Sequence, residues 1–324
     1  MRLRLVPKET NWDFFSRGKM WLGISGVMVV IAFVSFLIQG LNYGIDFSGG
    51  TTIRAESTTA VDVGVLRAAL DPLDLGDVSI TEVFDPTFGP DQNVVSITIQ
   101  ATEGHESVTT DMITAVGQAL LAVDEGLQLP FSSVESVGPT VSGELIQTAA
   151  LAVILAITAV LIYIWLRFEW QFALGAVVAL IHDVVLTIGV FSELQIRFDL
   201  AIIAALLTIV GYSLNDTVVV FDRVRENLIK YKKMSLKDVL NMSINETLSR
   251  TFMTSATTLI ALIALYVLGG DVIRGFVFAM IWGVIVGTYS SIFVASTTLL
   301  VLGVKRDWSK PDATSGTQFG NIDS

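Results

Sequence analysis

Residues 200–221 read LAIIAALLTIVGYSLNDTVVVF and hold a single charged side chain, that of Asp216. A helix needs about 20 apolar residues, each rising about 1.5 Å, to cross the roughly 30 Å hydrocarbon core of a bilayer. This stretch has the required length, and its one carboxylate lies inside it. It therefore predicts a membrane-spanning helix that carries an ionisable group, a rare arrangement that is usually functional.

Five further apolar runs have a similar length. They cover residues 20–39, 145–166, 171–192, 251–268 and 275–302. Only the run at 171–192 contains acidic or basic side chains, namely His182 and Asp183. The run at 20–39 has no small-residue cleavage site at its far end, which favours a retained helix over a signal peptide. Together the six runs predict an α-helical polytopic membrane protein.

The composition excludes several other classes of protein. Of the 324 residues, 52% are hydrophobic and 16% are charged, which is unusual for a soluble enzyme. The absence of cysteine excludes disulfide frameworks, thiolate zinc sites and cysteine nucleophiles. A net charge of -11 argues against nucleic acid as a partner, although such a sum misleads when its two signs lie on opposite sides of a membrane.

Lysine and arginine predict the orientation of the chain, because they concentrate in cytoplasmic loops. Alternating spans place sixteen of the 20 basic residues on one side and only Arg54, Arg67, Arg197 and Arg274 on the other. The side with sixteen contains residues 1–19, 167–170, 223–250 and 303–324. Both termini are therefore expected in the cytoplasm.

The single large loop, residues 41–140, is expected to fold outside the cytoplasm. Its pattern predicts strands and helices in the order βαββαβ, at residues 51–56, 60–70, 78–84, 94–101, 107–123 and 131–137. This order indicates a ferredoxin-like α+β domain, a fold with no single function. The loop holds fifteen acidic and two basic residues, which suits a solvated surface or, alternatively, a face that binds extended polypeptide. Glu103, His105 and Glu106 lack the spacing of a metal site, so no metal is expected.

The ionisable groups within the spans can be placed by helical rise. Asp183 lies about 18 Å from the cytoplasmic edge, near mid-membrane, and Asp216 lies about 6 Å inside that edge. Arg250 immediately precedes the span at 251–268 and lies at the level of Asp216. We therefore expect Asp216 and Arg250 to meet if their helices are neighbours.

Polar and small residues surround this predicted pair. Arg250, Thr254 and Thr258 share one helical face, and Tyr212, Ser213 and Asp216, with Asn215 beside them, line another. Gly283 and Gly287 form a GxxxG motif typical of closely packed helices. The buried charges have two interpretations: a fixed ion pair that locks helices together, or a carboxylate whose proton affinity a moving Arg250 would switch. For Asp183 beside His182, a proton-coupling role and a purely structural one are equally open.

The cytoplasmic segment 223–250 is expected to contain an amphipathic helix. Ser235 and Asp238 supply a capping start, and apolar residues recur after them. Contact with a protein channel and contact with lipid headgroups are both compatible with this pattern.

Several motifs resemble the SecF family, the smaller membrane subunits of the SecDF complexes of bacterial protein export, within the RND superfamily. They are GIDFSGGT at 44–51, VGPTVSGEL at 137–145, RFEW at 167–170, HDV at 182–184, GYSLNDTVVVFDRVREN at 211–227, LSRTFMTSATT at 248–258 and GTYSSIFVAS at 287–296. The resemblance covers nearly the whole chain and implies a six-helix RND-type half bundle in the bacterial inner membrane. In GIDFSGGT, Asp46, Gly49 and Gly50 would form the turn that leads into the outer domain.

The resemblance also implies a function and partners. The chain would work with SecD and YajC beside the SecYEG channel, after SecA has inserted the preprotein, and would use the proton-motive force to promote export. The family's carboxylate and arginine pair falls on Asp216 and Arg250, and SecD would supply the other half bundle. Neither a cofactor nor a hydrolytic site is implied.

Two alternatives remain. A passive membrane scaffold or substrate-binding anchor would use its buried charges only for assembly. An RND half-transporter for small molecules or lipids would need a larger outer domain than about 100 residues.

Overall fold

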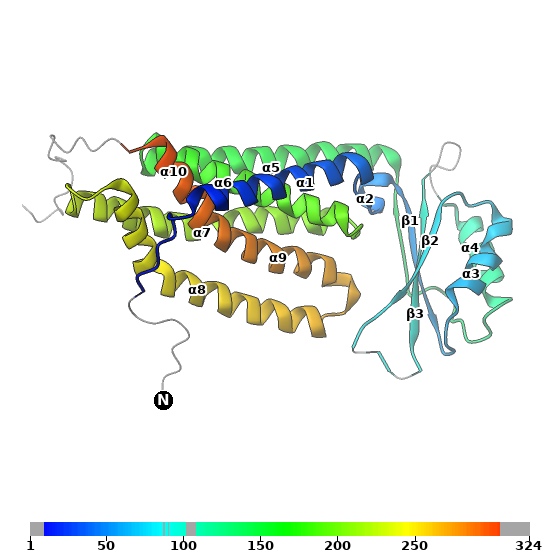
Figure 1. Ribbon diagram of the computed structural model, residues 1–324. Coiled ribbons are helices and arrows are strands. Elements are labelled where there is room, and N and C mark those ends of the chain that lie inside the picture. The colour runs from blue at the N-terminus through cyan, green and yellow to red at the C-terminus, as the bar shows by residue number, and fades with distance from the viewer. Residues whose placement is uncertain (1–9, 87, 90, 102–107, 305–324) are drawn as a thin grey trace, which may run out of the picture.

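The computed structural model describes residues 10–86, 88–89, 91–101 and 108–304. A long helical bundle carries a small α+β domain at one end (Figure 1). The residues considered and rejected as metal ligands, Glu103, His105 and Glu106, lie outside the described part of the chain. So do residues 1–9 and 305–324 of the predicted cytoplasmic segments.

Six long apolar helices form the bundle, which confirms the predicted fold class. The first three are α1 (Gly18–Gln39), α5 (Pro139–Arg167) and α6 (Trp170–Glu193). The others are α7 (Leu200–Lys230), α8 (Leu236–Leu268) and α9 (Gly270–Ser290), which continues through the π-helical segment η2 (Ser291–Ala295) into α10 (Ser296–Leu302). The helices α6, α7 and α9 are the most buried, and α1, α5 and α8 lie at the periphery.

The predicted amphipathic helix is not a separate element. It is the first part of α8, which begins after Ser235 and runs without a break into the apolar segment. The Ser235 hydroxyl accepts a hydrogen bond from the Asp238 amide at 3.2 Å, as a helix N-cap does. Hydropathy detects only the apolar part of such a helix, so both α7 and α8 are longer than the predicted spans.

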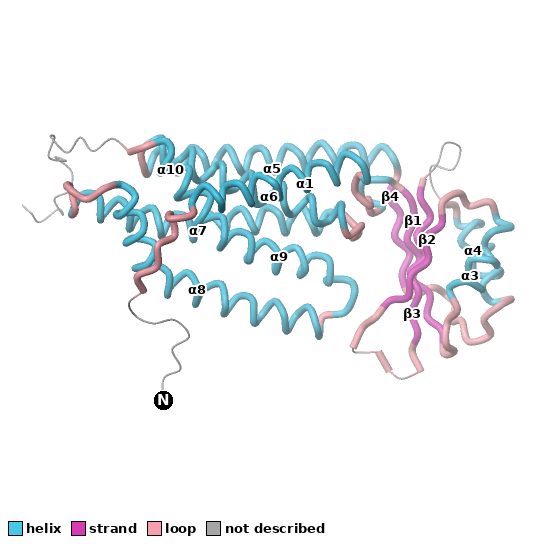
Figure 2. Tube along the Cα trace, viewed as in Figure 1, coloured by secondary structure: helices cyan, strands magenta, loops and turns pink. Residues whose placement is uncertain are grey.

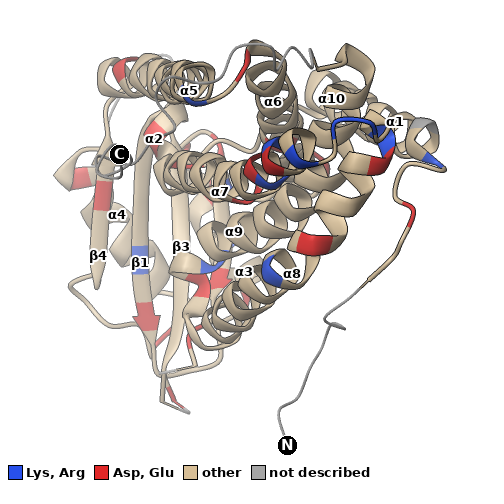
Figure 3. Cartoon of the chain, turned by 90° about the vertical axis from the view of Figure 1, so that its left-hand side faces the viewer, with Lys and Arg blue, Asp and Glu red and all other residues tan. Residues whose placement is uncertain are grey.

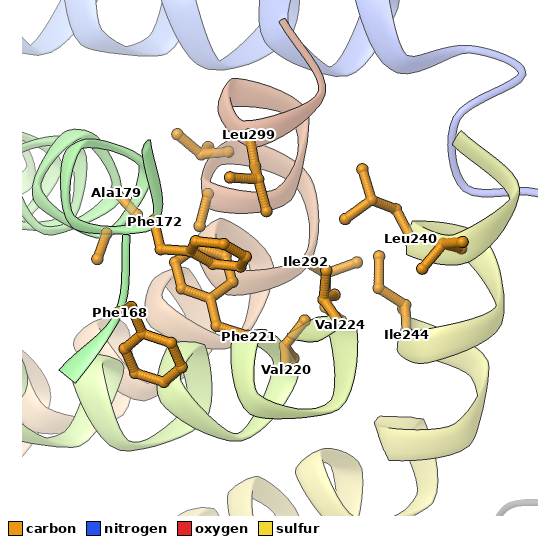
Figure 4. Close-up of a cluster of buried hydrophobic side chains, with 14 of the residues drawn as sticks. Phe168, Phe172, Ala179, Val220, Phe221, Val224, Leu240, Ile244, Ile292 and Leu299 are labelled. Atoms are coloured by element: carbon orange, nitrogen blue, oxygen red, sulfur yellow. The ribbon is translucent and has the colours of Figure 1, made fainter. Parts of the chain in front are cut away.

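Basic residues gather at the end of the bundle away from the α+β domain, at the ends of α5 and α7 and the start of α8. Figure 3 looks onto this end of the bundle. A core of aromatic and aliphatic side chains joins the helices there (Figure 4). The Phe172 ring stacks on Phe168 at 5.7 Å and meets the Phe221 ring edge-on at 5.2 Å. This core fixes α7 against α6 and α8 close to Asp216.

Residues 10–14, which precede α1, form a strap that is held on α8 by two asparagines. The Asn245 side chain accepts from the Trp12 amide and donates to the Trp12 carbonyl, both at 2.9 Å. The Asn241 side chain accepts from the Phe14 amide and donates to Asp13, both at 2.8 Å. The start of the described chain is thereby tied to the basic end of α8.

The α+β domain has the predicted βαββαβ order. Its elements are β1 (Gly50–Ser57), α3 (Val63–Leu70), β2 (Val78–Val83), β3 (Asn93–Gln100), α4 (Thr110–Leu121) and β4 (Ser133–Val137), with a 3-10 turn, η1 (Asp71–Leu73), after α3. The sheet order is β2-β3-β1-β4 with every neighbouring pair antiparallel, which confirms the ferredoxin-like prediction.

The sheet has one apolar and one polar face. Ile53, Val95 and Ile97 are fully buried beneath α3 and α4. The opposite face points toward the bundle (Figure 2). It borders a cavity of about 550 Å³, which the end of the bundle also lines.

The turn into the domain requires glycine. A four-residue helix, α2 (Ile45–Ser48), precedes Gly49 and Gly50, whose φ angles are 72° and 129°. A Cβ on Gly50 would lie 2.3 Å from the Ile99 carbonyl oxygen, so only glycine fits there. The carboxylate of Asp46 accepts a hydrogen bond from the Leu200 amide at 3.0 Å and thereby connects this turn to α7.

Candidate functional site

Asp216 is buried within the bundle, where its side chain is only 5% exposed. Its Oδ2 accepts a hydrogen bond of 3.1 Å from the Ser291 hydroxyl, which η2 supplies. The Thr251 hydroxyl of α8 also lies beside this carboxyl group, and the neighbouring Thr217 hydroxyl is buried without a hydrogen-bond partner among the described residues. The carboxyl group of Asp216 is therefore enclosed by residues of α7, α8 and η2.

Arg250 is the basic residue that we expected to meet this carboxylate. It is exposed on α8 and forms no ion pair within 4.0 Å among the described residues. Its positive charge still acts on Asp216 through space. The two residues are thus neighbours whose ion pair is open in this structure.

The buried face of α8 differs from the predicted one. Thr251 and Ser255 point inward, and the Ser255 hydroxyl bonds that of Thr288 at 2.7 Å. Thr254 is exposed, and Thr258 is partly buried, where it accepts a hydrogen bond from the Tyr212 hydroxyl at 3.4 Å. Ile244 and Thr247 are buried in the part of α8 that precedes the apolar run, and their packing determines which face of α8 points inward. Extending the periodicity from those residues would have identified Thr251 and Ser255.

Asp183 forms a second and better-satisfied site. It is 1% exposed on α6. Its Oδ2 accepts hydrogen bonds from Ser213 of α7 at 2.6 Å and from Ser290 of α9 at 2.8 Å. Its Oδ1 lies 3.0 Å from Nδ1 of His182. One carboxylate thereby joins the three innermost helices.

His182 extends this polar group toward α1. Its ring stacks on Tyr289 at 6.1 Å, and its Nε2 is buried without a hydrogen-bond partner. The Tyr289 hydroxyl in turn bonds Ser25 at 2.8 Å. Polar and aromatic side chains therefore follow one another from Asp183 to α1, with ring stacking and no hydrogen bond between His182 and Tyr289.

The predicted packing glycines lie on α9 against α7. A Cβ on Gly283 would fall 2.3 Å from the Ile209 side chain, and one on Gly287 would fall 3.0 Å from Ser213. This close approach brings Ser290 and Ser291 within reach of the two carboxylates. Asn215, by contrast, is exposed on the outside of the bundle.

The turn containing Asp46, Gly49 and Gly50 lies at the domain end of the bundle, apart from both carboxylates. Asp199, the N-cap of α7, lies next to it and outside the spans. Burial raises the pKa of Asp199. The negative charge of Asp46 also raises this pKa, whereas the positive charge of Arg197 lowers it. Within the described ranges, no group of three or more His, Asp or Glu side chains is arranged to hold a metal ion.

Two family descriptions match this chain. Residues 108–305 match "Protein export membrane protein SecD/SecF, C-terminal", and residues 34–61 match "SecD/SecF GG Motif". The second match contains the turn at Gly49 and Gly50, and the first contains every helix that carries Asp183, Asp216 or Arg250.

Proteins similar over nearly their full length are named protein translocase subunit SecF. That of Cereibacter sphaeroides is 59% identical over 323 residues, covering 100% of this chain and 99% of its own. That of Rhodobacter capsulatus is 58% identical, with 96% and 95% covered. That of Calditerrivibrio nitroreducens is 42% identical, with 91% and 95% covered.

Solved structures of SecDF have the same fold. The crystal structure of SecDF from Thermus thermophilus, a translocon-associated membrane protein, matches with a TM-score of 0.81 and 33% identity over 93% of this chain. A structure of SecDF in a super-membrane-facing form matches with a TM-score of 0.68 and 34% identity. This chain spans 40% of the length of each SecDF chain. From these likenesses and the shared motifs, the chain belongs to the SecD/SecF family of protein export membrane proteins, among its SecF translocase subunits.

Proposed function

We propose that this multi-pass inner membrane subunit pairs with SecD and uses the proton-motive force to promote polypeptide export. The observation that carries the proposal is the open pair of Asp216 and Arg250. Asp216 is 5% exposed and accepts a hydrogen bond from Ser291. Arg250 is close enough to act on it but forms no ion pair within the described residues.

An open pair of this kind can respond to helix movement. A nearby positive charge favours the ionised form of a buried carboxylate, and its withdrawal favours the protonated form. A shift of α8 that changes the distance from Arg250 to Asp216 would therefore take up or release a proton. Moving one charge across the membrane potential supplies about 2.3 kcal/mol per 100 mV, enough to bias two packing arrangements of a helix.

The direction of coupling depends on the orientation of the chain. The basic end of the bundle carries Arg167 and the charged ends of α7 and α8, which supports a cytoplasmic location for it and for both termini. The α+β domain then lies on the periplasmic side, and Asp216 lies nearer the cytoplasm than Asp183 does. A proton bound at Asp216 would have crossed most of the bilayer.

SecD completes this arrangement in our proposal. Arg250, Asn215 and Thr254 are all exposed on the outside of α7 and α8, although they belong to spans that cross an apolar bilayer. Polar groups at that depth normally face protein or a water-filled cavity. These exposed polar residues support the proposal that this face of α7 and α8 contacts the second half bundle, which SecD supplies. YajC, the SecYEG channel, SecA acting indirectly, and the translocating preprotein are the further partners we infer.

The test replaces Asp216 with asparagine, which retains the size and a hydrogen-bond acceptor but removes titration. Vesicles that contain SecYEG, SecD and the variant are supplied with SecA, ATP and a preprotein, with and without an imposed proton gradient. We expect unchanged ATP-driven export and loss of the additional export that the gradient produces. Asp222→Asn is the matched control, since Asp222 lies on the same helix but is half exposed and paired with Arg167 at 3.1 Å.

A passive scaffold is the second candidate. The three partners of Asp183 favour it, because that carboxylate joins helices without needing to titrate. Gradient-dependent export that survives Asp216→Asn would support the scaffold and contradict proton coupling.

A further inference from the structure

A contact between the bundle and the α+β domain lies far from the two attachment points of that domain. The chain enters the domain at β1 and leaves it from β4, both adjacent to α2 and α5. The β2–β3 loop lies at another corner, where it meets the turn between α8 and α9 (Figure 1). We call this contact the latch and define it by Phe84, Gly270, Asp271 and Arg274.

The latch is built from main-chain and side-chain contacts. The Phe84 amide donates to Oδ2 of Asp271 at 2.5 Å, and the Asp271 amide donates to the Phe84 carbonyl at 2.8 Å. The guanidinium of Arg274 pairs with Asp271 and lies over the Phe84 ring, 5.2 Å from its centroid. It also lies 5.7 Å from the centroid of Tyr266 on α8. One arginine therefore connects the ends of both helices to the domain.

The turn is shaped for this approach. Gly270 has a φ of 69°, and a Cβ there would fall 2.7 Å from Oδ2 of Asp85. Glycine is thus needed both for the backbone conformation and for the distance between the turn and the loop. The contact is part of how the hairpin of α8 and α9 is built.

The other end of the same hairpin carries the candidate proton site. Arg250 and Thr251 lie on α8, about 27 Å of helix away from its last residue, Leu268. Ser290 is the last residue of α9 and Ser291 is the first of η2, and their hydroxyls bond the two buried carboxylates. If the hairpin moves as one body, a displacement at the level of Asp216 also moves the latch.

We propose that the latch transmits movement of the α8–α9 hairpin to the α+β domain, with Arg274 and Phe84 as positioning residues for export. The domain is attached to the bundle at β1 and β4, so a force applied at the β2–β3 loop turns it about those attachments. The inference rests on the proposed proton coupling, because that coupling is what would displace α8.

The experiment measures domain position and export in the same variants, using the full chain with a cysteine-free SecD in liposomes. The chain itself has no cysteine, so Leu121→Cys on α4 and Leu194→Cys at the end of α6 allow two spin labels. Both positions are exposed, at 38% and 54%. Asp216→Asn imitates the protonated state, and the distance distribution between the labels reports the response of the domain.

Phe84→Ala, Asp271→Ala and Arg274→Gln together disrupt the latch, because they remove the aromatic ring, the carboxylate that accepts from the Phe84 amide and the guanidinium. Val65→Ala with Arg67→Gln is the control. Val65 and Arg67 are exposed on α3, on the side of the domain away from the bundle. In the parent and the control, we expect Asp216→Asn to shift the distance distribution. In the latch-disrupted chain, we expect Asp216→Asn to cause no shift. When that chain retains Asp216, we expect at least a twofold loss of gradient-stimulated export and an unchanged proton flux. Arg274→Lys should give a shift and an export level between those of the parent and the latch-disrupted chain, since lysine keeps the charge but lacks the planar group that stacks on the ring.

An unchanged shift after Asp216→Asn in the latch-disrupted chain would overturn the inference, as would export equal to that of the control. If Asp216→Asn abolishes stimulated export but the latch variants export normally, only the latch is refuted. If Asp216→Asn alters neither export nor domain position, the proposed function fails and the latch fails with it. Gly270→Ala provides a second disruption that keeps both aromatic and charged groups.

Discussion

Ser290 and Ser291 are adjacent in the chain, yet their hydroxyls donate to two different carboxylates, Asp183 at 2.8 Å and Asp216 at 3.1 Å. The boundary between α9 and η2 falls between them. A π-helical segment widens the helix locally and often marks a functional position. The two buried acids are therefore connected through a single peptide unit at a deformable point of the helix.

Replacing each serine by alanine should separate structure from coupling. Ser290→Ala leaves Asp183 with fewer donors and should lower the free energy of unfolding by about 1–3 kcal/mol, with gradient-stimulated export retained. Ser291→Ala removes a donor from Asp216 and should change the stimulated export more than it changes stability. Thermal unfolding in detergent and the vesicle export assay provide the two measurements. Equal effects of both variants on export would contradict this division.

Arg250 should act through its charge. Arg250→Gln is expected to abolish the export that the gradient adds, because no positive charge then responds to the ionisation of Asp216. Arg250→Lys should retain part of it. Arg167→Gln is the control, since Arg167 is 46% exposed and pairs with Asp222 instead. A Gln variant that exports as well as the parent would contradict a role for this charge.

Asp199 should make stability depend on pH. Burial raises its pKa, so the protonated form is favoured in the folded protein. The associated stability is present at low pH and is lost as pH rises through the raised pKa. Asp199→Asn keeps an effective N-cap and should raise the unfolding temperature at neutral pH, with the difference from the parent disappearing in acid. Asp62→Asn, at the exposed N-cap of α3, controls for exchanging a capping aspartate.

Gly283 should not tolerate a side chain while Ile209 is present. Gly283→Ala places a Cβ within 2.3 Å of Ile209, and such overpacking costs about 1–3 kcal/mol. Ile209→Ala should destabilise the protein alone but reduce the cost of Gly283→Ala in the double variant. Unfolding temperatures of the four chains form the cycle, and strictly additive effects would contradict direct contact between these residues.

The spans and the sheet could be predicted because their signals are local. Uninterrupted apolar runs predict helices long enough for a membrane, and alternating residues such as Val95 and Ile97 predict strands. The inward face of α8 could not be obtained from the span alone. Its rotation is set by Ile244 and Thr247, which pack before the apolar run begins.

Other features depend on contacts between distant residues. The π segment at 291–295 has no distinct hydropathy, since its residues are as apolar as those around them. The latch joins Phe84 and Asp271, which are 187 positions apart. Asp183 was predicted as a buried acid, but its bonds to Ser213 and Ser290 required the packing of three helices to be known.

The strap at residues 10–14 is held on α8 mainly through hydrogen bonds to its main-chain atoms. Asn245 binds both main-chain atoms of Trp12, and the indole itself is 58% exposed. A different side chain at residue 12 would therefore leave both of these hydrogen bonds in place, whereas loss of the Asn245 amide would remove them. The attachment of the N-terminal strap therefore depends more on two side chains of α8 than on the side chain of Trp12.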